Sequence, residues 1–190
     1  MAAAVPLDSN GHGGTYKLVG GAPSLDFANL VSYRGSARAH DWLDPPGNLA
    51  RWQDATGLRV RASVPTSVLV DLREALATVF LAVAAGGDPP GPAFDAVAAA
   101  AAGARARQHL VWDAAAGRAA WRLPAARLDD LLALDAADLL SDERTRSRLG
   151  ACAGCGWVYL DTTRNRSRRW CDPADCGNRA RQRRHYARRR

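Results

Sequence analysis

Cysteine is absent from the first 151 residues of this 190-residue chain, and Lys17 is its only lysine. No apolar run approaches the length needed to span a bilayer, since none is longer than the seven residues of 96–102. The first residues also lack the basic segment and long apolar core of a secretory signal. We therefore expect a cytoplasmic protein, in which clustered cysteines are more often metal ligands than disulfides.

Familiar catalytic motifs are missing as well. The sequence contains neither Gly-x-Ser-x-Gly nor His-Glu-x-x-His, and its four histidines are scattered. The Gly20-Gly21 pair is not followed by the Gly-Lys-Ser/Thr of a phosphate-binding loop. These absences argue against an enzyme.

Positive charge is concentrated at the C-terminal end. Residues 143–190 contain 14 arginines and four acidic residues, whereas residues 1–142 contain 12 basic and 15 acidic residues. Such asymmetry between two segments of one chain favours a polyanionic partner for the basic segment.

Apolar periodicity predicts an α+β fold in which a mainly helical domain with a small β-hairpin precedes a small zinc module. The expected division is a disordered N-terminus over 1–15, an α+β domain over 16–142 and a zinc module over 148–190. Ser24 is expected to cap the first helix, and Trp42, Trp52, Trp112 and Trp121 to lie in the core or line a pocket. The expected helices cover 25–31, 48–56, 66–85, 93–104 and 127–140, and the expected strands cover 16–19, 108–112 and 119–123.

The four cysteines form two pairs with the spacing of a metal site. Cys152-x2-Cys155 is typical of a knuckle that directs two thiolates at one ion, and Cys171-x4-Cys176 follows fifteen residues later. Four thiolates close a tetrahedral shell, so the expected cofactor is one structural Zn²⁺. Unligated cysteines or two disulfides are the alternatives.

The residues around the cysteines predict a treble-clef-like order of knuckle, β-hairpin and helix. Residues 157–160 have strand propensity, residues 168–170 are the expected return strand, and residues 161–165 supply the turn. Asp172 followed by Pro173 predicts the start of a helix that carries Cys176 in its first turn.

The basic helix and hairpin are the candidate nucleic-acid-binding surface. Arginine can form bidentate contacts with phosphate or guanine, and Asn178 can contact adenine. A solvated basic tail, docking on the acidic N-terminal domain, RNA binding and an adaptor that binds an acidic protein are the alternatives to duplex DNA. The candidate residues are Arg164, Arg166, Arg168, Arg169, Asn178, Arg179, Arg181, Arg183, Arg184 and Arg188.

Asp26 and Asn29 lie about one turn apart on a predicted helix beside Gly20-Gly21. Two interpretations are open for them. They line a small-molecule pocket in a sensor domain, or they form structural contacts that fix the Gly-Gly loop. The domain that contains them is expected to bind an effector or to self-associate, as in a homodimer.

Two motifs resemble known families. Cys176-Gly177-Asn178-Arg179, with the Asn165–Cys171 run and Cys152-x2-Cys155-Gly156-Trp157 before it, resembles the CGNR zinc finger. Gly20-Gly21-x3-Leu25-Asp26-Phe27-x-Asn29 resembles the ABATE domain, although Leu30 replaces the usual Thr. Together they cover nearly the whole chain, and the resemblance implies a bacterial zinc-binding protein that regulates transcription under stress.

Overall fold

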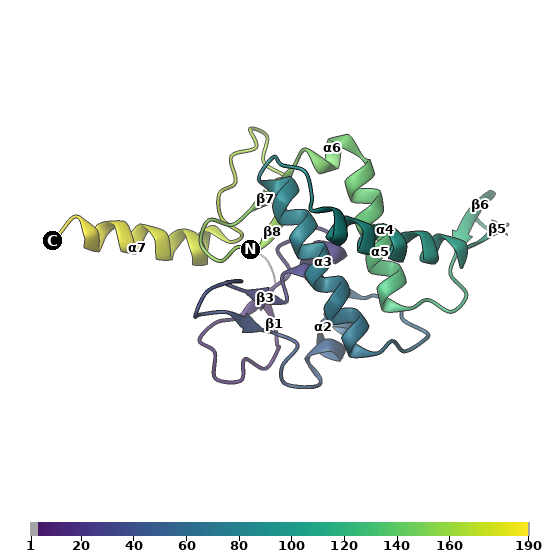
Figure 1. Ribbon diagram of the computed structural model, residues 1–190, viewed down its shortest axis with the longest axis horizontal. Helices are drawn as coiled ribbons and strands as arrows, with labels where there is room; N and C mark the ends of the chain where they lie inside the picture. The colour runs from purple at the N-terminus through teal and green to yellow at the C-terminus, as the bar shows by residue number, and fades with distance from the viewer. Residues whose placement is uncertain (1–3, 190) are drawn as a thin grey trace.

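The structure is a computed structural model that describes residues 4–189, and it has the mixed α+β architecture expected from the sequence (Figure 1). The strands pair in antiparallel twos: β1 (Ala4–Val5) with β2 (Tyr16–Lys17), β3 (Val31–Ser32) with β4 (His40–Asp41), β5 (His109–Asp113) with β6 (Arg118–Arg122), and β7 (Leu149–Ala151) with β8 (Val158–Leu160). The helices are α1 (Pro23–Ala28), α2 (Asn48–Thr56), α3 (Thr66–Ala84), α4 (Gly91–Ala106), α5 (Leu128–Ser141), α6 (Glu143–Arg146) and α7 (Asn178–Ala187), with a π-helical turn, η1 (Pro173–Gly177), before α7.

Helix α3 is the centre of the larger domain. Its apolar residues recur at three- and four-residue steps, and Leu69, Leu72, Leu76 and Phe80 are buried on the face that this spacing creates. The helix ends before Gly86, whose φ of +78° is the left-handed conformation that glycine adopts readily. Helices α4 and α5 pack beside α3 (Figure 1).

The N-terminal stretch differs from its expected disorder over residues 4–15. Strand β1 pairs with β2 and places Val5, 3% exposed, in the core. The buried side chain of Asn48 then holds the main chain of Asp8 from both sides, accepting from Asp8 N at 2.9 Å and donating to Asp8 O at 2.8 Å. These contacts are long-range, so the Gly-rich composition gave no sign of them. Residues 1–3 of the predicted stretch lie outside the described residues.

Helix α1 begins earlier than predicted. Pro23 occupies its first turn and Ala22 is the N-cap, so Ser24 is not the capping residue. The Ser24 main-chain N–H instead donates to the Asp135 carboxylate of α5 at 2.8 Å. A side chain 111 residues away thus satisfies one of the free amides in the first turn of α1.

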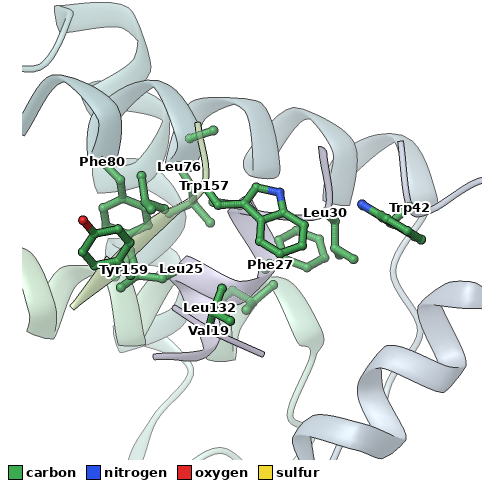
Figure 2. Packing of buried hydrophobic residues seen from close by; sticks show 14 of the residues in the cluster. Val19, Leu25, Phe27, Leu30, Trp42, Leu76, Phe80, Leu132, Trp157 and Tyr159 are labelled. Carbon is green, nitrogen blue, oxygen red and sulfur yellow. The ribbon is translucent and has the colours of Figure 1, made fainter. Parts of the chain in front are cut away.

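The zinc module shares one hydrophobic core with the larger domain. Trp157 and Tyr159 are buried at 7% and 1% exposure, and Figure 2 shows them among Leu25, Phe27 and Leu76 of the larger domain. All four cysteines belong to the same buried cluster. The two sequence segments therefore fold as one packed unit.

The strand that pairs with β8 differs from the one expected. Residues 168–170 form no strand, and β8 pairs instead with β7, which precedes the first cysteine pair. The knuckle therefore lies in the turn of the β7–β8 hairpin instead of preceding the hairpin, and η1 and α7 follow as the expected helical part. Asp161 explains the change, because its carboxylate accepts hydrogen bonds from Thr163 N and Arg168 N, both at 2.8 Å, and closes the intervening residues into a loop.

Two of the four tryptophans expected in the core are exposed. Trp42 and Trp52 are buried, whereas Trp112 and Trp121 are 67% and 58% exposed on the β5–β6 hairpin. The hairpin itself forms as predicted, but it projects from the end of the molecule opposite α7 (Figure 1). Among the described residues, no helix has the length and apolar character required to cross a membrane.

Candidate metal centre and nucleic-acid interface

The four cysteine sulfurs converge at one buried point. They all lie within 4.8 Å of one another, with Cys155–Cys171 and Cys171–Cys176 Sγ–Sγ distances of 3.4 and 3.6 Å. These distances are far longer than a disulfide bond of about 2.05 Å. They are close to the ~3.8 Å separation of neighbouring sulfurs around a tetrahedral Zn²⁺ with Zn–S bonds of about 2.3 Å. The cluster fits one structural zinc ion.

The first pair is held by the main chain of the β7–β8 hairpin. Cys152 N donates to Trp157 O at 2.8 Å, and Gly156 N donates to Cys152 O at 2.9 Å. The Gly154 amide points at the Cys152 sulfur at 3.4 Å, as a knuckle requires. A Cβ at Gly154 would approach Cys176 to 3.2 Å, so the small residue leaves room for the second pair.

The second pair is positioned by η1. Asp172 accepts from Ala174 N at 2.8 Å and thereby caps the turn, as predicted. Sequence reasoning missed that Asp172 also forms an ion pair with Lys17 at 2.5 Å, which ties the start of η1 to β2. Hydrogen bonds to the carboxylate lower the pKa of Asp172 despite its burial, with Lys17 as the main donor. The only lysine in the chain thus fixes the second cysteine pair.

Arg179 lies against the metal site. Its Nη2 donates to Cys176 Sγ at 3.2 Å, and its guanidinium also contacts Asp175 at 3.3 Å. Four thiolates around one Zn²⁺ leave two negative charges uncompensated, and a guanidinium bonded to one sulfur offsets part of that charge. Arg179 is therefore primarily a hydrogen-bond donor to the cysteine cluster.

Arg168 is engaged in a similar way. Its guanidinium lies over the Tyr159 ring at 4.1 Å. It donates to Val19 O of the larger domain at 3.1 Å and to Cys171 O at 2.5 Å. Arg168 therefore bridges the zinc module and the larger domain, with little of its guanidinium free for a phosphate.

Asn178 also has local partners. Its amide donates to Ala174 O at 2.6 Å and accepts from Arg181. These bonds join η1 to α7 where the π-helical turn ends. The Asn and Arg of the Cys-Gly-Asn-Arg run thus both support the metal site and the start of α7.

Asp26 and Asn29 are both buried, at 7% and 2% exposure. One carboxylate oxygen of Asp26, Oδ1, accepts from Val19 N at 2.9 Å and from Gly20 N at 2.7 Å. Burial raises the pKa of Asp26 to about 6, although these two bonds act to lower it. A Cβ at Gly20 would approach Leu25 and Asp26 to under 3.0 Å, so glycine is required for this close contact.

The Asn29 amide holds the zinc module directly. Its Nδ2 donates to Val158 O at 2.9 Å, and its Oδ1 accepts from Val158 N at 2.8 Å. Gly20 O accepts from Leu160 N at 2.8 Å, and Tyr33 N donates to Cys155 O at 3.0 Å. The Gly-Gly, Asp26 and Asn29 pattern therefore builds the face on which β8 and the knuckle dock.

The remaining arginines form an exposed surface. Every described residue from 181 onward is exposed, and Figure 1 shows α7 extending away from the body. The loop closed by Asp161 presents further exposed arginines, of which Arg169 lines a pocket together with Pro173 at the start of η1. The exposed arginines of the predicted set are Arg164, Arg166, Arg169, Arg181, Arg183, Arg184 and Arg188.

Comparisons with known proteins agree with both halves of this architecture. Residues 21–143 match the ABATE family, described as a putative stress-induced transcription regulator, and residues 148–189 match the CGNR zinc finger. These descriptions name a regulator and a zinc finger, not an enzyme. A search of curated proteins found no match. The chain belongs to the ABATE family and carries a C-terminal CGNR zinc finger.

Proposed function

We propose that this protein is a cytoplasmic, zinc-dependent transcription regulator that binds the phosphate backbone of duplex DNA through α7 and the loop over residues 161–169. The observation that carries the proposal is the uncompensated charge of α7. Arg181, Arg183, Arg184 and Arg188 are exposed on a helix with no acidic residue after Asp175. Like charges so close together are stabilised by an anionic partner.

The dimensions of this surface suit a duplex. A ten-residue helix is about 15 Å long, and the major groove of B-DNA, about 12 Å wide, accepts one helix. Arg164 and Arg169 lie on the adjacent loop, where they can reach phosphates that flank the groove. The zinc ion has no catalytic task in this proposal, because its four thiolate ligands leave no open position.

Docking of α7 on the acidic domain of the same chain lacks the packing that it requires. The main contacts of α7 are with η1, its own N-terminal extension, and the helix points away from the domain (Figure 1). An adaptor that binds an acidic protein, or an RNA-binding protein, would use the same arginines. These alternatives are therefore distinguished by competition.

The test is a fluorescence-anisotropy titration of a labelled duplex with the zinc-loaded full chain. Unlabelled duplex DNA, duplex RNA and poly-glutamate compete in separate arms. The proposal expects DNA to compete best, and the double variant Arg183→Ala/Arg184→Ala to weaken binding about tenfold or more at equal zinc content. Arg118→Ala on the distant hairpin is the matched control and should bind normally. Preference for RNA or poly-glutamate would favour the alternatives.

Effector binding is a separate proposal for the ABATE domain. Asp26 and Asn29 could bind an effector only by giving up their bonds to Val19, Gly20 and Val158. A groove of about 550 Å³ between α2 and the extended segment 58–64 is the better position. It is lined in part by Leu49, Leu58, Val60 and Leu69. An effector bound there should lose affinity in Leu58→Glu and not in Asp26→Asn, in which Oδ1 keeps both main-chain hydrogen bonds.

A further inference from the structure

The β5–β6 hairpin carries an uncovered apolar face. The register pairs Leu110 with Trp121 and Trp112 with Ala119, so all four side chains project from the same side. Leu110, Trp112 and Trp121 are 59%, 67% and 58% exposed, and Ala119 is exposed too. No other described strand pair carries so many exposed large apolar residues.

The opposite face of the hairpin has polar and charged residues at both ends, and the pair of Val111, 46% exposed, and Ala120 at its centre. Asp113 and Arg122 form an ion pair there at 3.1 Å, and His109 and Arg118 lie on the same side. This alternation is that of a strand pair with one solvated and one covered face. A two-stranded sheet without a cover is only marginally stable in water, so the apolar side calls for a partner.

We propose that a second copy of this chain covers the face, making the hairpin the interface of a homodimer. In such a dimer the apolar faces of the two hairpins stack on each other. If the two-fold axis lies between them and runs parallel to the strands, Leu110 lies over Trp121 of the other copy and Trp112 lies over its Ala119. An axis across the strands would place each tryptophan over Leu110 or Ala119. In both arrangements every indole meets a smaller side chain, so the face is complementary to itself.

The available area suits a weak but specific dimer. At up to ~250 Å² for a tryptophan side chain, the exposed parts of Trp112 and Trp121 amount to roughly 300 Å² per chain. With Leu110 and Ala119 the face reaches roughly 400 Å², the size at which exposed apolar patches mark interaction sites. Two copies would bury roughly 800 Å² before any rim contacts, close to the ~1,000 Å² of a small specific interface.

The position of the hairpin leaves the rest of the molecule free. The hairpin and α7 lie at opposite ends of the chain's long axis (Figure 1). Dimerisation there covers neither the arginine surface nor the cysteine cluster. The inference therefore stands independently of DNA binding, and failure of one does not affect the other.

The test is sedimentation velocity of the zinc-loaded full chain over a range of concentrations. We expect a reversible monomer–dimer equilibrium in the micromolar range. Trp112→Ser and Trp121→Ser should each raise the dimer dissociation constant at least about 30-fold, as for interface hot spots. Far-ultraviolet circular dichroism and zinc content report whether each variant is folded.

Ala119→Glu provides a variant that does not depend on removing tryptophan. Its exposed position tolerates a carboxylate in the monomer, but the dimer would bury that charge against an apolar side chain, so dimerisation should be lost. Val111→Glu places the same charge on the opposite face of the same hairpin and should dimerise normally.

Three results would overturn the proposal. One is a wild-type chain that stays monomeric up to its solubility limit. Another is a dimer that survives both tryptophan substitutions and Ala119→Glu. The third is a monomer that co-sediments with phosphatidylcholine–phosphatidylglycerol vesicles in a Trp112-dependent way, which would assign the face to a lipid surface.

Discussion

The side-chain amide of Asn29 forms two hydrogen bonds with the main chain of Val158, one with its carbonyl at 2.9 Å and one with its N–H at 2.8 Å. These residues are 129 positions apart, and they lie in the regions that match two different families. These two hydrogen bonds take the place of a neighbouring strand along the edge of β8 that does not face β7. They link the ABATE domain directly to the zinc finger.

Loss of that link should destabilise the whole chain. Asn29→Ala leaves the Val158 N–H and C=O buried without partners, so the free energy of unfolding should fall by about 2–4 kcal/mol. Urea unfolding followed by circular dichroism measures it. Asn165→Ala, at an exposed position in the 161–168 loop, is the matched control and should change stability little. Equal stability of the two variants would refute the structural role of Asn29.

Asp26 should give the fold a pH dependence of definite sign. Its pKa rises from 3.8 to about 6 in the folded chain. Between these values the folded state holds a proton that the unfolded state has released, so the contribution of Asp26 to stability falls as pH increases. The total loss is up to about 3 kcal/mol and is complete above about pH 6.

Asp26→Asn isolates this contribution. Oδ1 accepts both main-chain bonds, so the amide retains them. The stability difference between variant and wild type, from urea unfolding at each pH, should therefore shift in favour of the variant from pH 4 to pH 7. Asp88→Asn, at an exposed loop position, controls for the loss of one negative charge. A difference that does not change with pH would contradict the raised pKa.

Removal of zinc should unfold more than the C-terminal module. The cysteines belong to the same buried cluster as Leu25, Phe27 and Leu76 of the larger domain. Chelation, or Cys176→Ser, should therefore lower the melting temperature of the whole chain and leave no intact ABATE domain with its original transition. Calorimetry measures this. Two separate transitions, with the larger one unchanged by chelator, would show that the halves fold independently.

Arg179 and Arg183 should separate metal retention from DNA binding. Arg179 bonds the Cys176 sulfur, so Arg179→Ala should release zinc to a chromogenic chelator several-fold faster. Arg183 is exposed on α7, so Arg183→Ala should keep the wild-type release rate and lose only DNA affinity. Identical rates of zinc release in the two variants would contradict a role for Arg179 at the metal site.

The zinc ligands and the main helices were predictable because their signals are local. Two cysteine pairs a few residues apart specify a site, and the apolar spacing of 66–85 specifies a helix. The partner of β8 was not predictable, because Leu149-Gly150-Ala151 contains glycine and alanine, which have low strand propensity. Asn29 and Lys17 act on residues more than 120 positions away, which spacing along the chain cannot reveal.

Exposure was the other quantity that sequence could not supply. Leu110 and Trp112 alternate as they would in a strand with one buried face, and this pattern is the same whether the cover comes from the same chain or another. Likewise, an arginine count cannot distinguish Arg168, bonded to main-chain carbonyls, from Arg183, which is free.

The salt dependence of duplex binding tests the central claim most directly. If about five of the exposed arginines contact phosphates, log Kobs for the zinc-loaded chain should fall against log salt with a slope of about −4.5. Arg183→Ala should make that slope shallower by about 0.9, and Arg118→Ala on the distant hairpin should leave it unchanged. A wild-type slope near zero, or no binding at low salt, would contradict the proposal that this arginine surface binds DNA.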